Sequence, residues 1–207
     1  ASSNFGIPFP GTFLVDRNGI VTARFFEEAY QERTTVSNIL LQLGSEPGAT
    51  TPAVRIETDH LVATAYASDP VVSPGTLFSL VIDVEPKPRM HLYAPGAQNY
   101  RVIDLKLTPK PLLFERPVRY PESEIYFFEP LNEHVPVFQT PFRLALDVAL
   151  DGSREGREAL AAVKTFTIDG TLEYQACDDA VCFLPTSVPV SFTVQVRPLD
   201  TQRAAPR

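Results

Sequence analysis

The chain has 207 residues, 44% of them apolar, and a formal net charge of −7. This composition is enough for a full buried core. The net negative charge, with Lys and Arg scattered singly, argues against a nucleic-acid-binding surface and against a basic helix that lies on a membrane. Its 20 prolines fall between short apolar runs, which favours an all-β sandwich because proline is excluded from helix interiors and central ladders.

The first predicted element is a β-hairpin in TFLVDRNGIVTARFF, residues 12–26. Two β-type runs flank the segment from Asp16 to Gly19, and an Asn-Gly pair is typical of a tight hairpin turn. We interpret Asp16 as a turn residue that binds its own backbone rather than as a catalytic carboxylate.

A helix is predicted after this hairpin. Thr34 or Thr35 can cap its start, and Gly44 is placed to end it. Its expected apolar face consists of Val36, Ile39, Leu40 and Leu43. Because two strands and a helix of about 45 residues cannot enclose a core, we interpret residues 1–45 as the tail of a larger domain.

The next segment, residues 46–58, lacks periodicity and is rich in Gly, Pro, Ser and Thr, which predicts a linker. A second domain is predicted over residues 59–198, where short runs alternate with period two. The side chains expected to point inward are Phe78, Leu80, Ile82, Val84, Leu144, Leu146, Val148, Leu150, Val190, Phe192, Val194 and Val196. Those expected to face solvent are Ser79, Asp83, Arg143, Asp147, Ser191, Thr193, Gln195 and Arg197.

Such strands, buried on one face only, are typical of antiparallel sheets. Further runs are expected at 60–67, 89–93, 101–108, 163–168 and 171–177. The total of about seven or eight strands predicts a mainly β, immunoglobulin-like antiparallel sandwich, although the chain has no Trp and so lacks the Cys-Trp-Cys pattern of antibody domains. Residues 199–207 are predicted to be a disordered tail.

The two cysteines of the chain, Cys177 and Cys182, lie close together in YQACDDAVCFLP, residues 174–185. If the four residues between them form a hairpin loop, the cysteines become cross-strand neighbours with Cα atoms about 4.5 to 5.5 Å apart. A disulfide fits this geometry without any movement of the backbone.

The spacing leaves the role of this pair open. A staple that closes so short a loop contributes only about 2 kcal/mol, whereas reversible exchange needs a second thiol close enough to resolve a mixed disulfide. Asp178 and Asp179 are expected to raise the pKa of a neighbouring thiol, unlike the cationic settings of reactive cysteines. A redox pair and a structural disulfide are equally supported, and a metal pair is less so because thiolate sites usually have four ligands.

A resemblance to a known family favours the redox alternative. YQACDDAVCFLPTSVPVSF is similar to the cysteine hairpin of the N-terminal periplasmic domain of the DsbD family, the bacterial thiol-disulfide interchange proteins, and the likeness extends over residues 59–198. RMHLYAPG and VRYPESEIYFFEPLNEHVPVF resemble the early aromatic strand and the segment leading to the cap loop of that family. The resemblance implies an immunoglobulin-like fold that relays electrons from a membrane-embedded domain to periplasmic partners.

The resemblance also implies roles for single residues. Cys182 would form the mixed disulfide with a partner protein, and Cys177 would then resolve it. The prolines of YPESEIYFFEPLNEHVPVF predict a loop rather than a regular strand, with Phe127 or Phe128 as a shielding aromatic and Glu124 adding negative charge. The remaining residues expected to line the site are Tyr93, Asp178 and Asp179.

The N-terminal segment has a resemblance of its own. GIPFPGTFLVDRNGIV resembles the closing half of a thioredoxin-like or peroxiredoxin-like redoxin domain. Pro10 occupies the position where such domains often carry a cis peptide beside the active site. The redox cysteines of that domain would then lie upstream of these residues.

The function predicted is therefore that of a thiol-disulfide oxidoreductase of the protein-disulfide reductase type, with thioredoxin-like partners. The alternative is a non-catalytic interaction domain with an inert disulfide. His91 and His134 are interpreted as surface or hydrogen-bonded residues, and we expect no metal, cofactor or nucleotide site. We also expect no signal peptide or membrane span within these residues, so a periplasmic location follows only from the resemblance.

Overall fold

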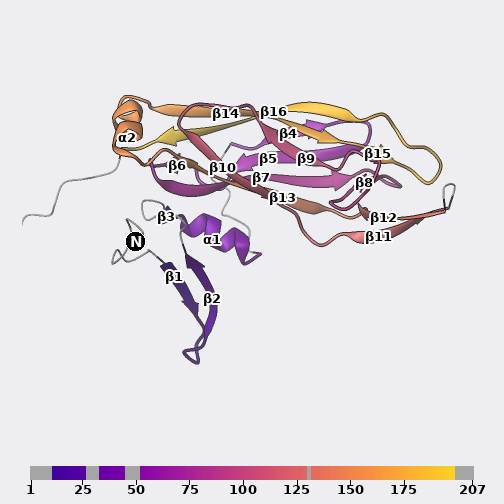
Figure 1. The fold of residues 1–207 in the computed structure, drawn as a ribbon, viewed down its shortest axis with the longest axis horizontal. Helices are drawn as coiled ribbons and strands as arrows, with labels where there is room; N and C mark the ends of the chain where they lie inside the picture. The colour runs from indigo at the N-terminus through magenta and orange to yellow at the C-terminus, as the bar shows by residue number, and fades with distance from the viewer. Residues whose placement is uncertain (1–10, 27–32, 45–51, 130–131, 199–207) are drawn as a thin grey trace, which may run out of the picture.

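The computed structural model describes residues 11–26, 33–44, 52–129 and 132–198, most of which form a sandwich of two main sheets (Figure 1). The strand order of the first sheet is β10 (Leu113–Arg119), β13 (Phe142–Leu150), β7 (Thr76–Pro86), β5 (Leu61–Ala67) and β4 (Val54–Glu57). The order of the second is β6 (Val71–Val72), β16 (Thr186–Val196), β14 (Thr165–Tyr174) and β9 (Asp104–Leu107). The prediction of a mainly β, immunoglobulin-like sandwich is confirmed.

The core lies between these two sheets. Every residue that the alternation placed inward on β7, β13 and β16 is at most 8% exposed. The neighbouring strands pair antiparallel, with Leu144 opposite Ile82 and Phe166 opposite Val194. Each such side chain contributes about 1.5 to 3 kcal/mol by leaving water, so period-two alternation determines the inner faces of these strands.

The structure contains elements that the sequence did not predict. β4 lies within residues 46–58, the predicted linker, and pairs with β5. Only Ile56 is buried in this short strand, so it carries no periodic signal. The helix α2 (Arg154–Leu160), which was also not predicted, begins after Ser153, whose side chain accepts the Gly156 N–H. The predicted tail, residues 199–207, lies outside the described residues.

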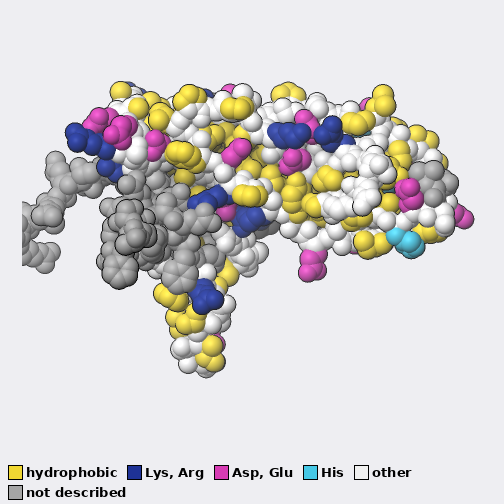
Figure 2. Space-filling model, viewed as in Figure 1, with side chains coloured by type: hydrophobic (Ala, Val, Ile, Leu, Met, Phe, Trp, Pro, Cys, Tyr) yellow, Lys and Arg dark blue, Asp and Glu magenta, His cyan; other side chains and the backbone are white. Residues whose placement is uncertain are grey.

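The predicted N-terminal hairpin is present as β1 (Gly11–Val15) and β2 (Val21–Phe26). Asp16 Oδ1 accepts the backbone N–H groups of Asn18 and Ile20, and Gly19 has a φ of 79°. The interpretation of Asp16 as a turn residue is therefore confirmed. The hairpin projects from the sandwich with apolar side chains exposed (Figure 2).

The predicted helix is present as α1 (Val36–Gln42), but its buried face differs from the expected one. Thr35 accepts the Asn38 N–H at the N-terminus, and Gly44 has a φ of 76° beyond the C-terminus, as predicted. The buried residues of the helix are Asn38, Ile39 and Leu41. Val36, Leu40 and Leu43 are 72%, 39% and 49% exposed, so the expected apolar face is wrong except at Ile39.

Hydrogen bonds between α1 and the first sheet explain why the helix buries this face rather than the expected one. Asn38 is fully buried, and its Nδ2 donates to Ser79 Oγ at 2.7 Å and to Asp147 Oδ1 at 2.8 Å. Arg119 donates to the same Asp147 oxygen at 2.8 Å. The expectation that Ser79 and Asp147 face solvent is therefore wrong: they are 0% and 8% exposed, as part of a polar network beneath α1. The short strand β3 (Arg33–Thr34) also pairs with β7, parallel to it.

We predict that Asn38→Ala lowers the free energy of unfolding by about 2 kcal/mol, because it removes the two buried hydrogen bonds that the Asn38 amide donates to Ser79 and Asp147. Urea unfolding of the full chain measures this loss. Val36→Ala, on the exposed side of the same helix, is the control and should change stability by less than about 0.5 kcal/mol. An equal effect of the two substitutions would show that α1 does not belong to the folding unit of the sandwich.

A small third sheet lies at one end of the sandwich, far from α2 and from the N-terminal hairpin (Figure 1). Its strand order is β11 (Glu124–Phe128), β12 (Glu133–Phe138), β8 (His91–Tyr93) and β15 (Ala176–Cys177). Because β15 follows β14 of the second main sheet after a single residue, this end of the sandwich holds the first cysteine.

Candidate functional site

Both cysteines lie at the tip of a short hairpin. The Asp178 N–H donates to Val181 O at 3.0 Å, which closes the loop between Cys177 and Cys182. The two Cα atoms are 4.1 Å apart and the sulfurs form a disulfide. The prediction that the cysteines are cross-strand neighbours is confirmed, with a slightly closer approach than expected.

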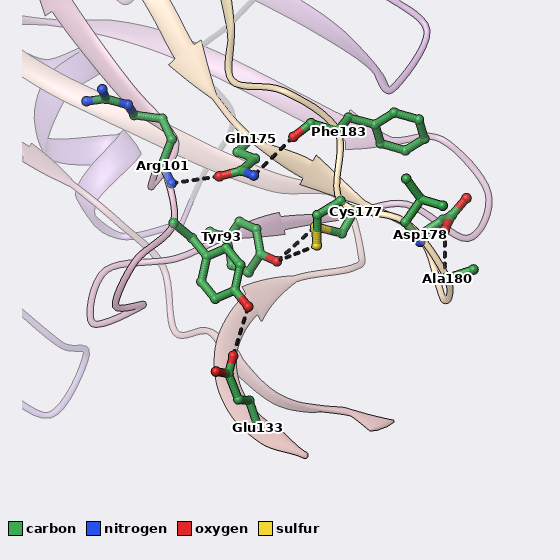
Figure 3. The surroundings of a disulfide bond; sticks show 11 residues. Tyr93, Arg101, Glu133, Gln175, Cys177, Asp178, Ala180 and Phe183 are labelled. Carbon is green, nitrogen blue, oxygen red and sulfur yellow. Dashed lines mark hydrogen bonds between the residues drawn. A yellow bond between two sulfur atoms is a disulfide. The ribbon is translucent and has the colours of Figure 1, made fainter. Parts of the chain in front are cut away.

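Gln175 fixes the base of this hairpin (Figure 3). Its Nε2 donates to Phe183 O at 3.0 Å, and its Oε1 accepts the Arg101 N–H at 3.0 Å. One side chain thus connects the returning arm of the hairpin to the chain before β9. The cysteines are therefore held by contacts on both sides of the loop.

The two aspartates of the loop have different contacts. Asp178 Oδ1 accepts the backbone N–H groups of Ala180 and Val181, and these two hydrogen bonds lower the pKa of this carboxyl. Asp179 contacts Arg89 Nε at 3.3 Å and accepts from the Tyr126 hydroxyl at 3.3 Å. Asp178 therefore stabilises the loop itself, whereas Asp179 connects the loop to β11 and to the turn before β8.

The two cysteines are unequal in exposure. Cys177 is fully buried, whereas Cys182 is only partly buried. The Tyr93 hydroxyl points at both sulfurs, 2.8 Å from Cys177 Sγ and 3.3 Å from Cys182 Sγ (Figure 3). Burial raises the pKa of Tyr93, so this hydroxyl stays protonated and available as a donor. The structure thus places Tyr93 in the site, as expected.

A second tyrosine extends this arrangement to the surface. The Tyr100 ring stacks on Tyr93 with centroids 4.0 Å apart and an interplanar angle of 11°. The Tyr100 hydroxyl donates to Glu133 Oε2 at 2.8 Å, and burial together with this carboxylate raises the pKa of Tyr100. A polar recess of about 280 Å³ lies beside this pair and is lined by Gly96, Gln98, Asn99, Tyr100, Glu133, His134, Val135 and Pro136.

We predict that Tyr93→Phe raises the pKa of the Cys177 thiol by about 1 to 2, because a hydrogen bond to a charged group contributes about 1.5 to 3 kcal/mol. This shift is measured as the thiolate absorbance at increasing pH in a Cys182→Ser background. The absorbance of a variant that lacks both cysteines is subtracted. Tyr120→Phe is the matched control, since the Tyr120 hydroxyl donates to Asp104 and not to a sulfur. Superimposable titrations of the Tyr93 variant and its parent would contradict the role of this hydroxyl.

His91 also lies in the site and is not a surface residue, so the surface alternative of that interpretation is wrong. It is 1% exposed and pairs directly opposite Cys177 in the ladder between β8 and β15. Its ring contacts Tyr93 edge-on, with centroids 5.8 Å apart, and Tyr126 at 4.6 Å. His134 is exposed, as expected.

The segment predicted as a cap loop is a β-hairpin, so the prediction of an irregular loop is wrong. β11 pairs with β12 over its whole length, from Glu124 opposite Val137 to Phe128 opposite Glu133. Pro136 does not break β12, because the strand pairing requires no N–H at this position. The Pro136 carbonyl still accepts the Ala94 N–H at 2.9 Å.

The register of this hairpin determines which aromatic side chain reaches the cysteines. An apolar group around the disulfide, here called the disulfide cluster, consists of Tyr93, Val135, Val137 and Cys177, with Ala97, Tyr100, Tyr126 and Cys182 packed against it. Tyr126 is the β11 residue in this cluster. Phe127 points to the opposite face, where it is 46% exposed and contacts the His134 ring at 4.9 Å.

The other predicted cap residues do not contribute to the cluster. Phe128 is 5% exposed on the face of Tyr126, but it is absent from the disulfide cluster among the residues that the structure describes. Glu124 is exposed at the start of β11. Of the three aromatic residues Tyr126, Phe127 and Phe128, Tyr126 is therefore the one that packs against the disulfide cluster. Pro10 lies outside the described residues.

In the part of the chain that the structure describes, no helix has the length and apolar character needed to cross a membrane. No protein-family model matches this chain, and no curated protein matches it.

Several solved structures are similar to it, among them two N-terminal domains. The N-terminal periplasmic domain of ScsB from Proteus mirabilis is 13% identical with a TM-score of 0.48, over 68% of this chain and 49% of that one. The N-terminal domain of Neisseria meningitidis DsbD in the reduced form is 15% identical with a TM-score of 0.38, over 75% of this chain and 97% of that one. The match therefore spans about half of the ScsB chain. Both are N-terminal domains of the kind that the sequence resemblance named, and neither bears on the redoxin-like resemblance of residues 1–45.

Proposed function

We propose that residues 59–198 form a thiol-disulfide interchange module in which Cys177 and Cys182 relay electrons to or from protein partners. The unequal environment of the two sulfurs supports this most directly. Cys182 is the more exposed of the two cysteines, while the buried Cys177 has the Tyr93 hydroxyl as a donor for the thiolate that would form there. A disulfide that only stapled this short hairpin would need neither feature.

The chemistry follows from this asymmetry. A partner's thiolate attacks Cys182 Sγ, a bond forms between these two sulfurs, and the bond to Cys177 breaks with the electron pair leaving on Cys177. A second thiolate of the partner then attacks the mixed disulfide, so the partner becomes oxidised and the cysteine pair reduced. In the reverse direction, Cys182 attacks a partner's disulfide and Cys177 resolves the intermediate.

The partners proposed are thioredoxin-like proteins or domains, with a membrane-embedded protein as a further electron donor. We place the module in the periplasm or another extracytoplasmic compartment, because structural and redox disulfides persist in oxidising surroundings. Residues 1–45 would end a redoxin domain whose cysteines lie upstream. The division into residues 1–45, 46–58 and 59–198 is part of this proposal.

The reduction potential of the pair tests the function. We expect a value between about −270 and −120 mV, the range of proteins that exchange disulfides. Equilibration of the full chain in glutathione and thioredoxin buffers, followed by alkylation and mass analysis, measures it. A potential below about −300 mV would favour the alternative, an inert structural disulfide in an interaction domain.

A further inference from the structure

His91 is the buried titratable side chain that the proposed exchange leaves without a role. It stands directly opposite Cys177, and directly paired residues share one face of a sheet, with Cβ atoms about 4.5 to 5.5 Å apart. Tyr93, two residues along the same strand, shows that this face holds the sulfurs, since its hydroxyl contacts both. Among the described residues, His91 Nδ1 has no hydrogen-bond partner.

An unpartnered buried nitrogen is costly, because a buried polar group without a hydrogen bond loses its hydration and gains nothing in return. Such a group needs an explanation beyond packing. Cys177, the residue directly opposite, gains an S–H group when the disulfide is reduced.

The surroundings of Cys177 make its ionisation difficult. The residue is fully buried, with Val135 and Val137 beside it in the disulfide cluster. Burial in apolar surroundings raises the pKa of a thiol. The nearby carboxylates of Asp178 and Asp179 also disfavour a further negative charge on the Cys177 sulfur. The Tyr93 hydroxyl acts in the opposite direction, and we expect the reduced Cys177 to carry a proton that it must lose before it can attack.

The protonation state of His91 suits a proton acceptor. Burial lowers its pKa, and this effect outweighs the opposing influence of Asp179 and Asp178. The other groups facing it are the hydroxyls of Tyr93 and Tyr126, whose pKa values are raised, so both are neutral. The imidazole is thus uncharged at neutral pH and has one nitrogen free to accept a proton.

We propose that His91 is the proton acceptor for Cys177 in the resolving step, an inference that rests on the proposed exchange function. The Cys177 S–H proton passes to the imidazole as Cys177 Sγ attacks Cys182 Sγ in the mixed disulfide. The bond between the two cysteines forms, and the bond to the partner's sulfur breaks. The electron pair leaves on the partner as a thiolate, and His91 returns its proton to water.

The resolving step can be isolated with a small disulfide, 4,4′-dithiodipyridine, as the probe. The reduced full chain is loaded at acidic pH, where His91 is protonated, and one thiopyridone is released as Cys182 forms the mixed disulfide. A stopped-flow jump to higher pH then starts the attack by Cys177, which releases the second thiopyridone. The absorbance of this second release reports on Cys177 alone.

We expect the wild-type rate of the second release to level off by about pH 6.5, above which His91 is neutral. His91→Gln and His91→Phe should be about 100-fold slower at pH 7, the lower end of general-base effects. Their rates should keep rising about tenfold per pH unit, since the thiolate must then form without a base. His134→Gln, at the exposed histidine of β12, should match the wild type.

The phenylalanine variant keeps the ring contacts with Tyr93 and Tyr126, so a folded protein without a base is available if the glutamine variant does not fold. A wild-type profile that rises through neutral pH without levelling off would overturn the proposal, as would an unchanged rate in either folded variant. A chain that releases both thiopyridones but does not exchange disulfides with thioredoxin-like proteins would instead contradict the proposed function.

Discussion

Cys177→Ser should turn a transient intermediate into a stable covalent complex. Cys182 is the partly exposed sulfur, so it can still attack the disulfide of an oxidised thioredoxin-like protein. With Ser at position 177 no thiol remains to resolve the product, and the adduct accumulates. Incubation of the variant with oxidised thioredoxin, followed by non-reducing electrophoresis and mass analysis, measures the yield.

Cys182→Ser is the matched control for this experiment. It leaves the fully buried Cys177, which a partner's disulfide cannot reach in the folded chain. We expect at least about tenfold less adduct from this variant. Equal yields from both variants would contradict the assignment of Cys182 as the attacking residue.

The sequence predicted the parts of this fold that local patterns determine. Period-two alternation identified the inner faces of β7, β13 and β16 because each of these strands faces one continuous core. The spacing of Cys177 and Cys182 predicted their pairing because a short hairpin loop fixes cross-strand neighbours regardless of the rest of the chain.

The errors arose where distant segments meet. Ser79 and Asp147 are buried because α1 covers them, and their partner Asn38 lies 41 and 109 residues away in sequence. No local pattern around β7 or β13 could show that a helix packs on the outer face. A polar residue among apolar ones on a short helix, as at Asn38, was the available signal.

The site was predicted in part for the same reason. Tyr93 and the loop aspartates were expected, but Tyr126 and His91 were not. In a run of aromatic residues such as Tyr126 to Phe128, the strand register determines which ring faces the cysteines, and a shift of one residue reverses the answer. His91 is sequence-distant from Cys177, and only the pairing of β8 with β15 brings the two together.

Tyr126→Ala should speed the reaction of the reduced chain with iodoacetamide. The Tyr126 ring contacts His91 at 4.6 Å and its hydroxyl donates to Asp179 at 3.3 Å, so this side chain joins β11 to the cysteine loop. Loss of such a hydrogen bond costs about 1 kcal/mol, and loss of the ring contact adds to it. If the thiols react through a local opening of this end of the sandwich, a loss of about 1.4 kcal/mol makes alkylation about tenfold faster.

Two variants separate shielding from other effects. Phe127→Ala removes a ring on the opposite face of the same strand and should alkylate at the wild-type rate. Phe78→Ala truncates a fully buried residue of the main core and should lower stability by about 3 to 5 kcal/mol. Unfolding curves of all three variants show whether faster alkylation reflects local opening or global unfolding. If Phe127→Ala exposes the thiols and Tyr126→Ala does not, the shielding residue is the phenylalanine that the sequence predicted, and Tyr126 serves only to pack β11 against β8.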